Sequence, residues 1–121
     1  MKHLAKLLIA ILSFSAMADV PLEQKSEVEH LLKFVSHSEC VMIRNGSEHS
    51  GSEAAKHIQN KYDYFVDDIK TTEQFIEYSA TKSTMSGKYY TVDCPDGKKM
   101  RSQDWLLEEL AQYRQNSATK E

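Results

Sequence analysis

The chain has 121 residues, of which 40% are hydrophobic, 27% are charged and 9% are aromatic. This length suits one domain, since domains cluster at ~100–150 residues, and the composition is that of a globular protein. Lys and Arg total 15 against 18 Asp and Glu, which gives a net charge of −3. Nucleic-acid binding relies on a basic surface that releases phosphate counterions, so the charge balance argues against that class of partner.

The first 18 residues have the pattern of a secretory signal peptide. Lys2 and Lys6 give a positive start, residues 7–14 are apolar, and residues 16–18 spell an Ala-Met-Ala cleavage site. The apolar run is shorter than the ~20 residues that a membrane-spanning helix needs. We therefore expect cleavage after Ala18 and export, with no membrane span left after cleavage. The mature chain would then carry 13 basic and 18 acidic residues.

The two cysteines of the chain are Cys40 and Cys94. In an exported domain the compartment is oxidising, and an even cysteine count favours one structural disulfide. It would close a loop of about 55 residues and stabilise the fold by ~4 kcal/mol. A redox pair or a metal site is the competing interpretation, but neither C-x-x-C nor a Cys/His cluster of metal-ligand spacing is present. We expect the pair to be bonded and no cofactor to be held.

The first half of the mature chain is predicted to hold two helices with a short strand between them. Residues 40–43 are β-prone, and Asn45-Gly46 after them is a turn signal. Ser50 and Glu53 spell a capping box, which starts a second helix near residue 51. We expect that helix to end near residue 70 and to be the longest in the protein. Apolar residues at helical spacing indicate the first helix, over residues 22–37: Val28, Leu31, Leu32 and Val35. The buried positions of the second helix are expected to be Ala54, Ile58, Lys61 or Tyr62, Phe65 and Ile69.

The second half of the chain is predicted to hold two further helices around a pair of strands. The segment Thr71-Thr72-Glu73-Gln74 supplies the cap of a short helix over residues 73–81, and a Ser/Thr/Gly loop follows that helix. Residues 89–93 form a strand of β-branched and aromatic residues, a turn follows at residues 95–97, and residues 98–101 return. Ser102 is expected to cap a last helix over residues 103–115 with four inward residues: Trp105, Leu106, Leu110 and Tyr113.

These elements predict an α+β domain over residues 19–115, with about four helices packed on a small two- to three-stranded antiparallel sheet. Because a disulfide needs Cα atoms within ~7 Å, residues 40–44 and 89–94 are expected to be neighbouring antiparallel strands. Tyr89 and Tyr90 point to opposite faces of a strand, so one is expected in the core and the other in solvent. Residues 116–121 are expected to be a disordered tail.

Several segments resemble the YfeK-like family of small exported bacterial proteins, a domain of unknown function. The resemblance covers about residues 22–114 and implies a bacterial envelope protein in the periplasm. It implies no activity, and it carries over no functional residue. The matching segments are Ser38-x-Cys40-x-x-Ile43-Arg44-Asn45-Gly46, Glu53-Ala54-Ala55-x-His57, Lys61-Tyr62, Ile69-Lys70-Thr71-Thr72-Glu73-x-Phe75-Ile76, Ser83-Thr84-Met85-Ser86-Gly87-Lys88-Tyr89-Tyr90, Cys94-Pro95 and Trp105-Leu106-Leu107.

Two patterns that would point to catalysis are incomplete. His49, Glu53 and His57 are metal-ligand types spaced i, i+4, i+8, but the capping box occupies Glu53, and the H-E-x-x-H zinc signature is absent. Ser79-x-x-Lys82 matches the nucleophile motif of serine acyl-transfer enzymes, yet the S-D-N and K-T-G elements that accompany it are missing. We therefore predict no catalytic residue and no metal ligand.

A cluster of polar residues leaves two interpretations open. The first is an internal network of ion pairs and helix caps, in which Arg44 pairs with Glu53 or Glu73. The second is a small pocket for an anion or a peptide, lined by Arg44, His57 and Lys88. Arg44, Glu53, His57 and Lys88 are the candidate ligand-binding residues, and the full cluster is Arg44, Asn45, Glu53, His57, Lys61, Lys70, Glu73, Lys82 and Lys88.

The sequence thus favours a non-enzymatic periplasmic domain that binds or modulates another envelope component, either a protein or a glycan. The alternative is a small hydrolase or a metal-dependent enzyme with its site around His57. A third possibility is a structural protein without a ligand.

Overall fold

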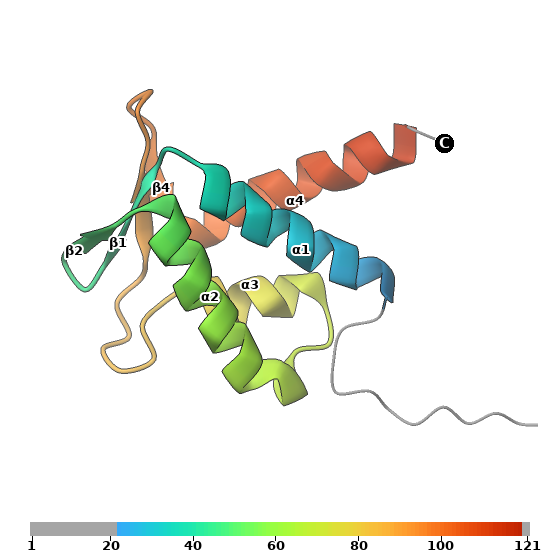
Figure 1. The fold of residues 1–121 in the computed structure, drawn as a ribbon, viewed down its shortest axis with the longest axis horizontal. Coiled ribbons are helices and arrows are strands. Elements are labelled where there is room, and N and C mark those ends of the chain that lie inside the picture. Colours follow the sequence, from blue (N-terminus) through green and yellow to red (C-terminus); the bar gives the residue numbers. More distant parts are fainter. Residues whose placement is uncertain (1–21, 120–121) are drawn as a thin grey trace, which may run out of the picture.

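The computed structural model describes residues 22–119, so the predicted signal peptide lies outside the described residues. Four helices and a four-stranded antiparallel sheet make up this part of the chain (Figure 1). The helices are α1 (Leu22–His37), α2 (Gly51–Phe65), α3 (Thr72–Ala80) and α4 (Ser102–Thr119), with a 3-10 turn η1 (Val66–Asp68) after α2. The strands are β1 (Val41–Arg44), β2 (Ser47–His49), β3 (Thr91–Asp93) and β4 (Lys99–Arg101).

The sheet has the order β2-β1-β3-β4, and each neighbouring pair is antiparallel. This confirms the α+β class, but the sheet has one strand more than the sequence indicated. The added strand is β2, which pairs with β1 through a tight hairpin at Asn45-Gly46. Both turn residues have positive φ, 49° and 82°, which is the conformation of the hairpin turns that Asn-Gly favours.

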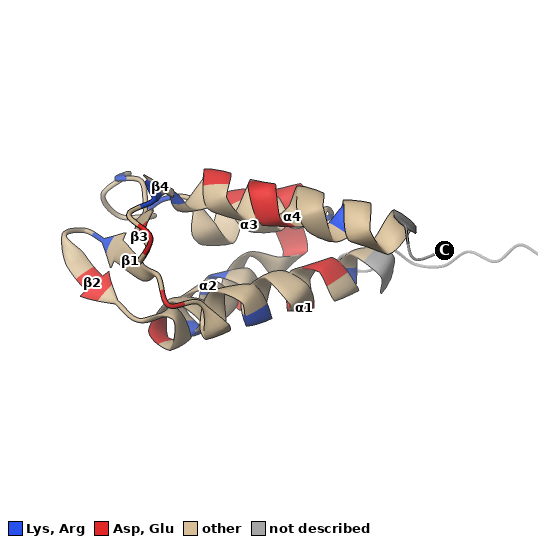
Figure 2. Ribbon diagram, turned by 90° about the horizontal axis from the view of Figure 1, so that it is seen from above, with Lys and Arg blue, Asp and Glu red and all other residues tan. Residues whose placement is uncertain are grey.

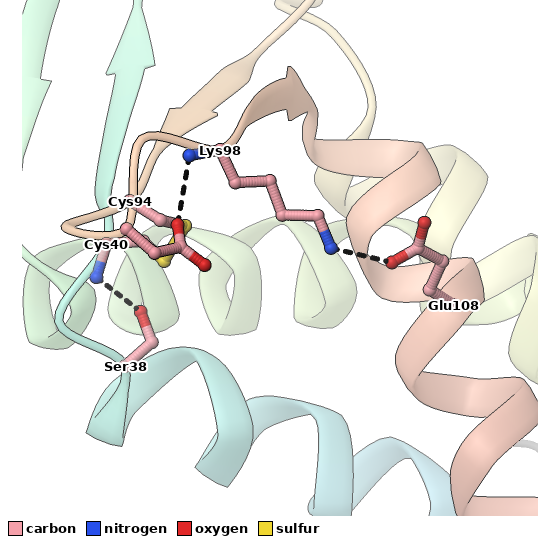
Figure 3. Close-up of a disulfide and its surroundings, with 6 residues drawn as sticks. Ser38, Cys40, Cys94, Lys98 and Glu108 are labelled. Carbon is pink, nitrogen blue, oxygen red and sulfur yellow. Dashed lines mark hydrogen bonds and ion pairs between the residues drawn. A yellow bond between two sulfur atoms is a disulfide. The ribbon is translucent and has the colours of Figure 1, made fainter.

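Cys40 and Cys94 form the predicted disulfide (Figure 3). They lie immediately outside the pairing of β1 with β3, in which Val41 is opposite Asp93. The expected neighbouring of these two segments is therefore confirmed, and the bond joins their ends. The Cys40 N–H donates to the Ser38 hydroxyl at 3.1 Å, which fixes the short connection from α1 to β1.

The helices cover one face of the sheet and enclose the core between them. In Figure 2 the sheet lies at one end of the molecule, and α1 and α4 run away from it side by side. Met42 and Val92 are the strand residues that face the core, each almost without exposure to solvent. The core residues are Val28, Leu31, Val35, Met42, Ala54, Ile58, Tyr62, Ile69, Phe75, Ile76, Ala80, Tyr90, Val92, Trp105, Leu106 and Leu110.

The helix ends differ from the sequence-based boundaries. α2 stops at Phe65 and passes into η1, where Asp67 and Asp68 lie near the helix C-terminus, the end that disfavours negative charge. At 18 residues α4 is the longest described helix, not α2 with 15, because nothing in residues 116–119 breaks it. The part of the expected tail that is described, residues 116–119, is therefore helical.

The predicted helix caps are partly confirmed. Ser50 and Glu53 form the reciprocal capping box of α2, and the Thr71 hydroxyl accepts the N–H of Gln74 at the start of α3. Ser102 does not cap α4. It is the first helical residue instead, and its buried hydroxyl has no hydrogen-bond partner, because the chain enters α4 directly from β4.

Within residues 22–119 no helix combines the length and the apolar character that a membrane span requires.

Candidate functional site

A pocket of about 400 Å³ lies between α2, the end of β1 and the segment over residues 82–90. Its volume is within the range of sites that hold small molecules or short pieces of a larger ligand. No Asp or Glu is among the lining residues, which are Arg44, Asn45, His57, Asn60, Lys61, Tyr64, Phe65, Ser83, Thr84, Met85 and Tyr90.

Regular secondary structure positions the polar side chains of the pocket. His57 and Lys61 are four residues apart on α2, so they share one face of that helix. Arg44 is the last residue of β1, immediately before the Asn45-Gly46 turn. Tyr90 precedes β3, and its backbone N–H donates to the carbonyl of Thr81 at 2.9 Å. The two cationic residues, Lys61 and Arg44, therefore belong to a helix and a strand, and regular secondary structure fixes the position of their backbones.

The loop over residues 82–90 lines the pocket opposite α2, and hydrogen bonds connect it to the β1–β2 turn. The Asn45 side chain donates to the Ser83 hydroxyl at 3.3 Å and accepts from the Ser86 hydroxyl at 2.6 Å. Inside the loop, the Ser83 N–H donates to the carbonyl of Lys88, and the Gly87 N–H to the carbonyl of Ser83. The wall is therefore organised by its own bonds before any ligand arrives.

At the centre of the pocket the Tyr90 hydroxyl joins two side chains of α2. It lies 3.2 Å from Nζ of Lys61 and 3.1 Å from Nε2 of His57. An ammonium group only donates, so the Tyr90 oxygen accepts from Lys61, and its own proton is free to bond a neutral Nε2 of His57. Lys61 also donates to the carbonyl of Lys82 at 2.8 Å.

The positive charge of the pocket has no carboxylate partner in the described residues. Nη2 of Arg44 lies 3.3 Å from Nδ1 of His49, and Nε of Arg44 is buried without a hydrogen-bond partner. The carboxylate of Glu53 lies 3.6 Å from the same His49 nitrogen and accepts the Ser50 N–H in the capping box. Arg44 and Lys61 therefore face a pocket whose lining supplies no negative charge.

Burial, and after it the nearby charges, shifts the pKa values of three pocket residues. Burial, followed by the charges of Arg44, Lys61 and His49, lowers the pKa of His57 from 6.5 to about 4. Burial and then Arg44 also lower the pKa of Lys61. Burial raises the pKa of Tyr90, against a smaller lowering effect of Arg44. At neutral pH His57 is thus uncharged, and the positive charge is carried by the Arg44 and Lys61 side chains.

The structure brings together two of the four candidate ligand-binding residues. Arg44 and His57 line the pocket, whereas Glu53 and Lys88 do not. Neither Glu53 nor Glu73 forms the ion pair with Arg44 that the network interpretation required, and Glu73 pairs with Arg114 at 2.7 Å instead. Lys61 lines the pocket, and Lys88 does not.

The incomplete catalytic patterns remain incomplete in three dimensions. No group of three His, Cys, Asp or Glu side chains that could hold a metal ion occurs in residues 22–119. Ser79 is fully buried and its hydroxyl has no partner, while Lys82 is exposed and its ammonium lies over the Tyr89 ring. The Ser79-x-x-Lys82 pair is therefore not assembled as a nucleophile and its base.

Lys61 and Tyr90 line the pocket but are not among the four candidate ligand-binding residues predicted from the sequence. Lys61 was named only as a member of the wider polar cluster. Their sequence signals were present but ambiguous, because Lys61 competes with Tyr62 for the buried stripe of α2. Tyr90 was expected only to differ in burial from Tyr89, and it does, at 2% against 42% exposure. The spacing of His57 and Lys61 places them on one face, but no local pattern indicates that residues 82–90 fold over that face.

Comparison with known proteins places the chain in a family. A family model described as "Family of unknown function (DUF5329)" matches residues 22–114. The chain is also 29% identical over 92 residues to a protein of Salmonella typhimurium (strain LT2) described as "Uncharacterized protein YfeK", covering 74% of this chain and 77% of that one. No solved structure matches the chain. The chain therefore belongs to the family of unknown function DUF5329, as the resemblance to YfeK-like proteins implied.

Proposed function

We propose that this protein is a non-enzymatic binding domain of the bacterial periplasm, and that its pocket takes an anionic group of an envelope component. The observation that carries the proposal is a pocket lined by Arg44 and Lys61 with no carboxylate among its lining residues. Removing a cation partly from water without an acidic partner raises the free energy of the folded protein, and an anion that binds in the pocket offsets that increase. Such hydrogen bonds between opposite charges are the stronger kind.

Two further features support a binding role. The pocket walls are held by the Asn45 and Ser83 bonds, so little ordering is needed when a ligand binds, which favours affinity. The disulfide and the predicted signal peptide both suit a protein of an oxidising compartment. Residues 1–18 would be removed on export, and residues 19–115 would be the working domain.

The binding proposal is tested by titrating the folded protein with acetate and inorganic phosphate while its ¹H–¹⁵N NMR signals are followed. We expect saturable shifts at Arg44, His57 and Lys61. Lys61→Gln should weaken binding about tenfold, because loss of a charged hydrogen bond costs about 1.5 kcal/mol or more. Lys88→Gln is the matched control, since it removes the same charge from a residue that lies in the adjoining loop but does not line the pocket.

Affinity of Lys88→Gln within twofold of wild type, beside the weakened Lys61→Gln, would support a site rather than a general charge effect. Equal losses in the two variants, or shifts that do not saturate in the wild type, would contradict the proposal. A spectrum that shows both variants folded is part of the measurement, and Arg44→Gln provides a second variant for the same comparison.

The proposed location has its own test, native mass spectrometry of the protein recovered from the periplasm of an export-competent bacterium. We expect a chain that starts at Asp19 and is two hydrogens lighter than its reduced form. A chain that still starts at Met1 would contradict cleavage of the signal peptide on export, and two free thiols would contradict the disulfide. Turnover of an envelope substrate that a single side-chain substitution abolishes would contradict the non-enzymatic role.

A further inference from the structure

The mouth of the pocket carries apolar side chains that stand in solvent. Tyr64 on α2 is 81% exposed and Met85 in the facing loop is 96% exposed, and both line the pocket. They are the two most exposed large hydrophobic side chains whose exposure the structure describes. Phe65 lies beside them, with its ring centroid 4.8 Å from that of Tyr64. Exposed apolar groups gathered around a polar site mark places where a ligand or partner binds.

These side chains come from both sides of the pocket and frame its cationic interior. Tyr64 and Phe65 follow Lys61 on α2 by three and four residues, which is about one helical turn. Met85 comes from the loop that is hydrogen-bonded to Asn45. A ligand whose anionic group reaches Arg44 and Lys61 therefore lies in a pocket that Tyr64 and Met85 also line. Methionine adapts its shape to an apolar partner, which suits a site that accepts more than one side chain.

The remaining lining groups suit a peptide more than a sugar or a fatty acid. Asn60 and Thr84 add an amide and a hydroxyl, the groups that hydrogen-bond a peptide backbone. Sugar hydroxyls also donate hydrogen bonds and are commonly held by acceptors, but no carboxylate lines the pocket. A fatty-acyl chain would leave the Asn60 and Thr84 groups without partners, and the exposure of Tyr64 and Met85 offers it no enclosed channel.

We propose that the pocket recognises the C-terminal carboxylate of a peptide chain whose last side chain is apolar. The carboxylate lies at Arg44 and Lys61, and the apolar side chain packs against Tyr64, Phe65 and Met85. Asn60 meets the last peptide group. This inference rests on the proposed anion-binding function and assigns the ligand class for the same pocket.

The test is a titration of the mature protein with three acetylated tripeptides, followed by calorimetry or NMR. They are Gly-Gly-Phe as the free acid, Gly-Gly-Phe as the C-terminal amide, and Gly-Gly-Gly as the free acid. We expect the Phe-ended acid to bind at least tenfold more tightly than either of the others. Met85→Ser should weaken the Phe-ended acid about fivefold and leave the Gly-ended acid unchanged. Leu107→Ser is the control, because Leu107 is an exposed hydrophobic residue on α4 outside the pocket.

Each other outcome overturns a defined part of the account. Equal binding of the two free acids would leave the anion pocket standing but exclude recognition of an apolar C-terminus. Equal binding of the Phe-ended acid and its amide would overturn anion recognition as well. Octanoate and glucuronate are titrated in the same way as comparison probes, and tighter binding of either one than of the Phe-ended acid would assign the pocket to an amphiphile or an acidic glycan instead. Failure of every probe to bind would overturn both proposals.

Discussion

Tyr90 connects the pocket to the core of the protein. Its ring is buried beside β3, while its hydroxyl lies within 3.2 Å of both the Lys61 ammonium and the His57 imidazole. The ring of Tyr90 also lies 5.2 Å from the Lys61 nitrogen, in a cation–π arrangement. One residue therefore contributes packing on one side and holds the polar groups of α2 on the other.

The substitution Tyr90→Phe keeps the ring and removes the hydroxyl. We expect it to lower the free energy of unfolding by about 1–3 kcal/mol, because Lys61 and His57 each lose a partner in a half-buried setting. Tyr89→Phe is the matched control: that side chain is 42% exposed, and its ring lies 3.7 Å from the Arg101 guanidinium carbon, a contact that Phe retains. Urea unfolding of the two variants checks this, and equal stabilities would contradict the role given to Tyr90.

Only part of this residue-level arrangement could be predicted from sequence. Arg44 and His57 were identifiable because a strand end and a helix face position them, and both are local features. The choice of Lys61 over Lys88 depended on the path of the loop before β3. That path is set by the bonds of Asn45 with Ser83 and Ser86, which join residues about 40 positions apart. The spacing of hydrophobic residues in the sequence does not predict hydrogen bonds between residues so far apart.

At the scale of elements, the docking of α2 on α1 depends on a close approach at Gly51. A Cβ added there would overlap the backbone carbonyl oxygen of Val35 and lie 2.8 Å from that of Ser38. Both carbonyls belong to the C-terminal end of α1 and the residues just after it. Because the obstacles are backbone atoms, a side chain at this position forces the two elements apart.

We therefore expect Gly51→Ala to lower the free energy of unfolding by about 1–3 kcal/mol, the usual cost of overpacking, although Ala is the better helix former. Ser52→Ala serves as the comparison, since Ser52 is the next residue of α2 and is exposed. Chemical denaturation of both variants is the measurement. A Gly51→Ala protein as stable as wild type would show that α2 is not held this closely to α1.

Helices and strands with clear caps or hydrophobic patterns were predictable from the sequence, whereas β2, which has neither, was missed. The capping box at Ser50 and the cap at Thr71 located two helix starts, because capping depends on residues three positions apart. The strand β2 is a run of three polar residues, Ser47–His49, with no hydrophobic alternation. Its only signal was the Asn45-Gly46 turn before it, and the pairing with β1 comes from the geometry of that turn.

At the scale of the whole molecule, the disulfide joins the segment after α1 to the end of β3 across 54 positions of the chain. It was predictable, together with the β1–β3 pairing, because the sequence holds two cysteines, which allow one intramolecular bond. A second tie lies at the other end of the helices, where Arg114 of α4 contacts Glu27 of α1 and Glu73 of α3, each at 2.7 Å. That tie was not foreseen, since it joins three helices that share no sequence pattern.

Reduction of the disulfide should lower the free energy of unfolding by ~4 kcal/mol, because the unfolded chain regains the freedom of a loop of about 55 residues. Urea unfolding of the oxidised protein and of the Cys40→Ser/Cys94→Ser double variant measures the difference. We expect the variant to keep the native spectrum at low urea. Equal stabilities of the two proteins would contradict a stabilising role for the bond.

The account as a whole rests on a pocket whose positive charge is unpaired until an anion binds, and His57 reports on that charge. Burial and the charges of Arg44, Lys61 and His49 hold its pKa at about 4 in the free protein. A bound anion offsets the repulsion from Arg44 and Lys61, so it favours the imidazolium form and raises the pKa of His57.

The most direct measurement is therefore an NMR titration of the His57 ring with and without saturating inorganic phosphate, which stays anionic through the pH range in which His57 titrates. We predict a pKa of about 4 in the free protein, as the structure indicates, and a higher value with the anion bound. A His57 pKa that saturating phosphate leaves unchanged would contradict the claim that this is an anion pocket.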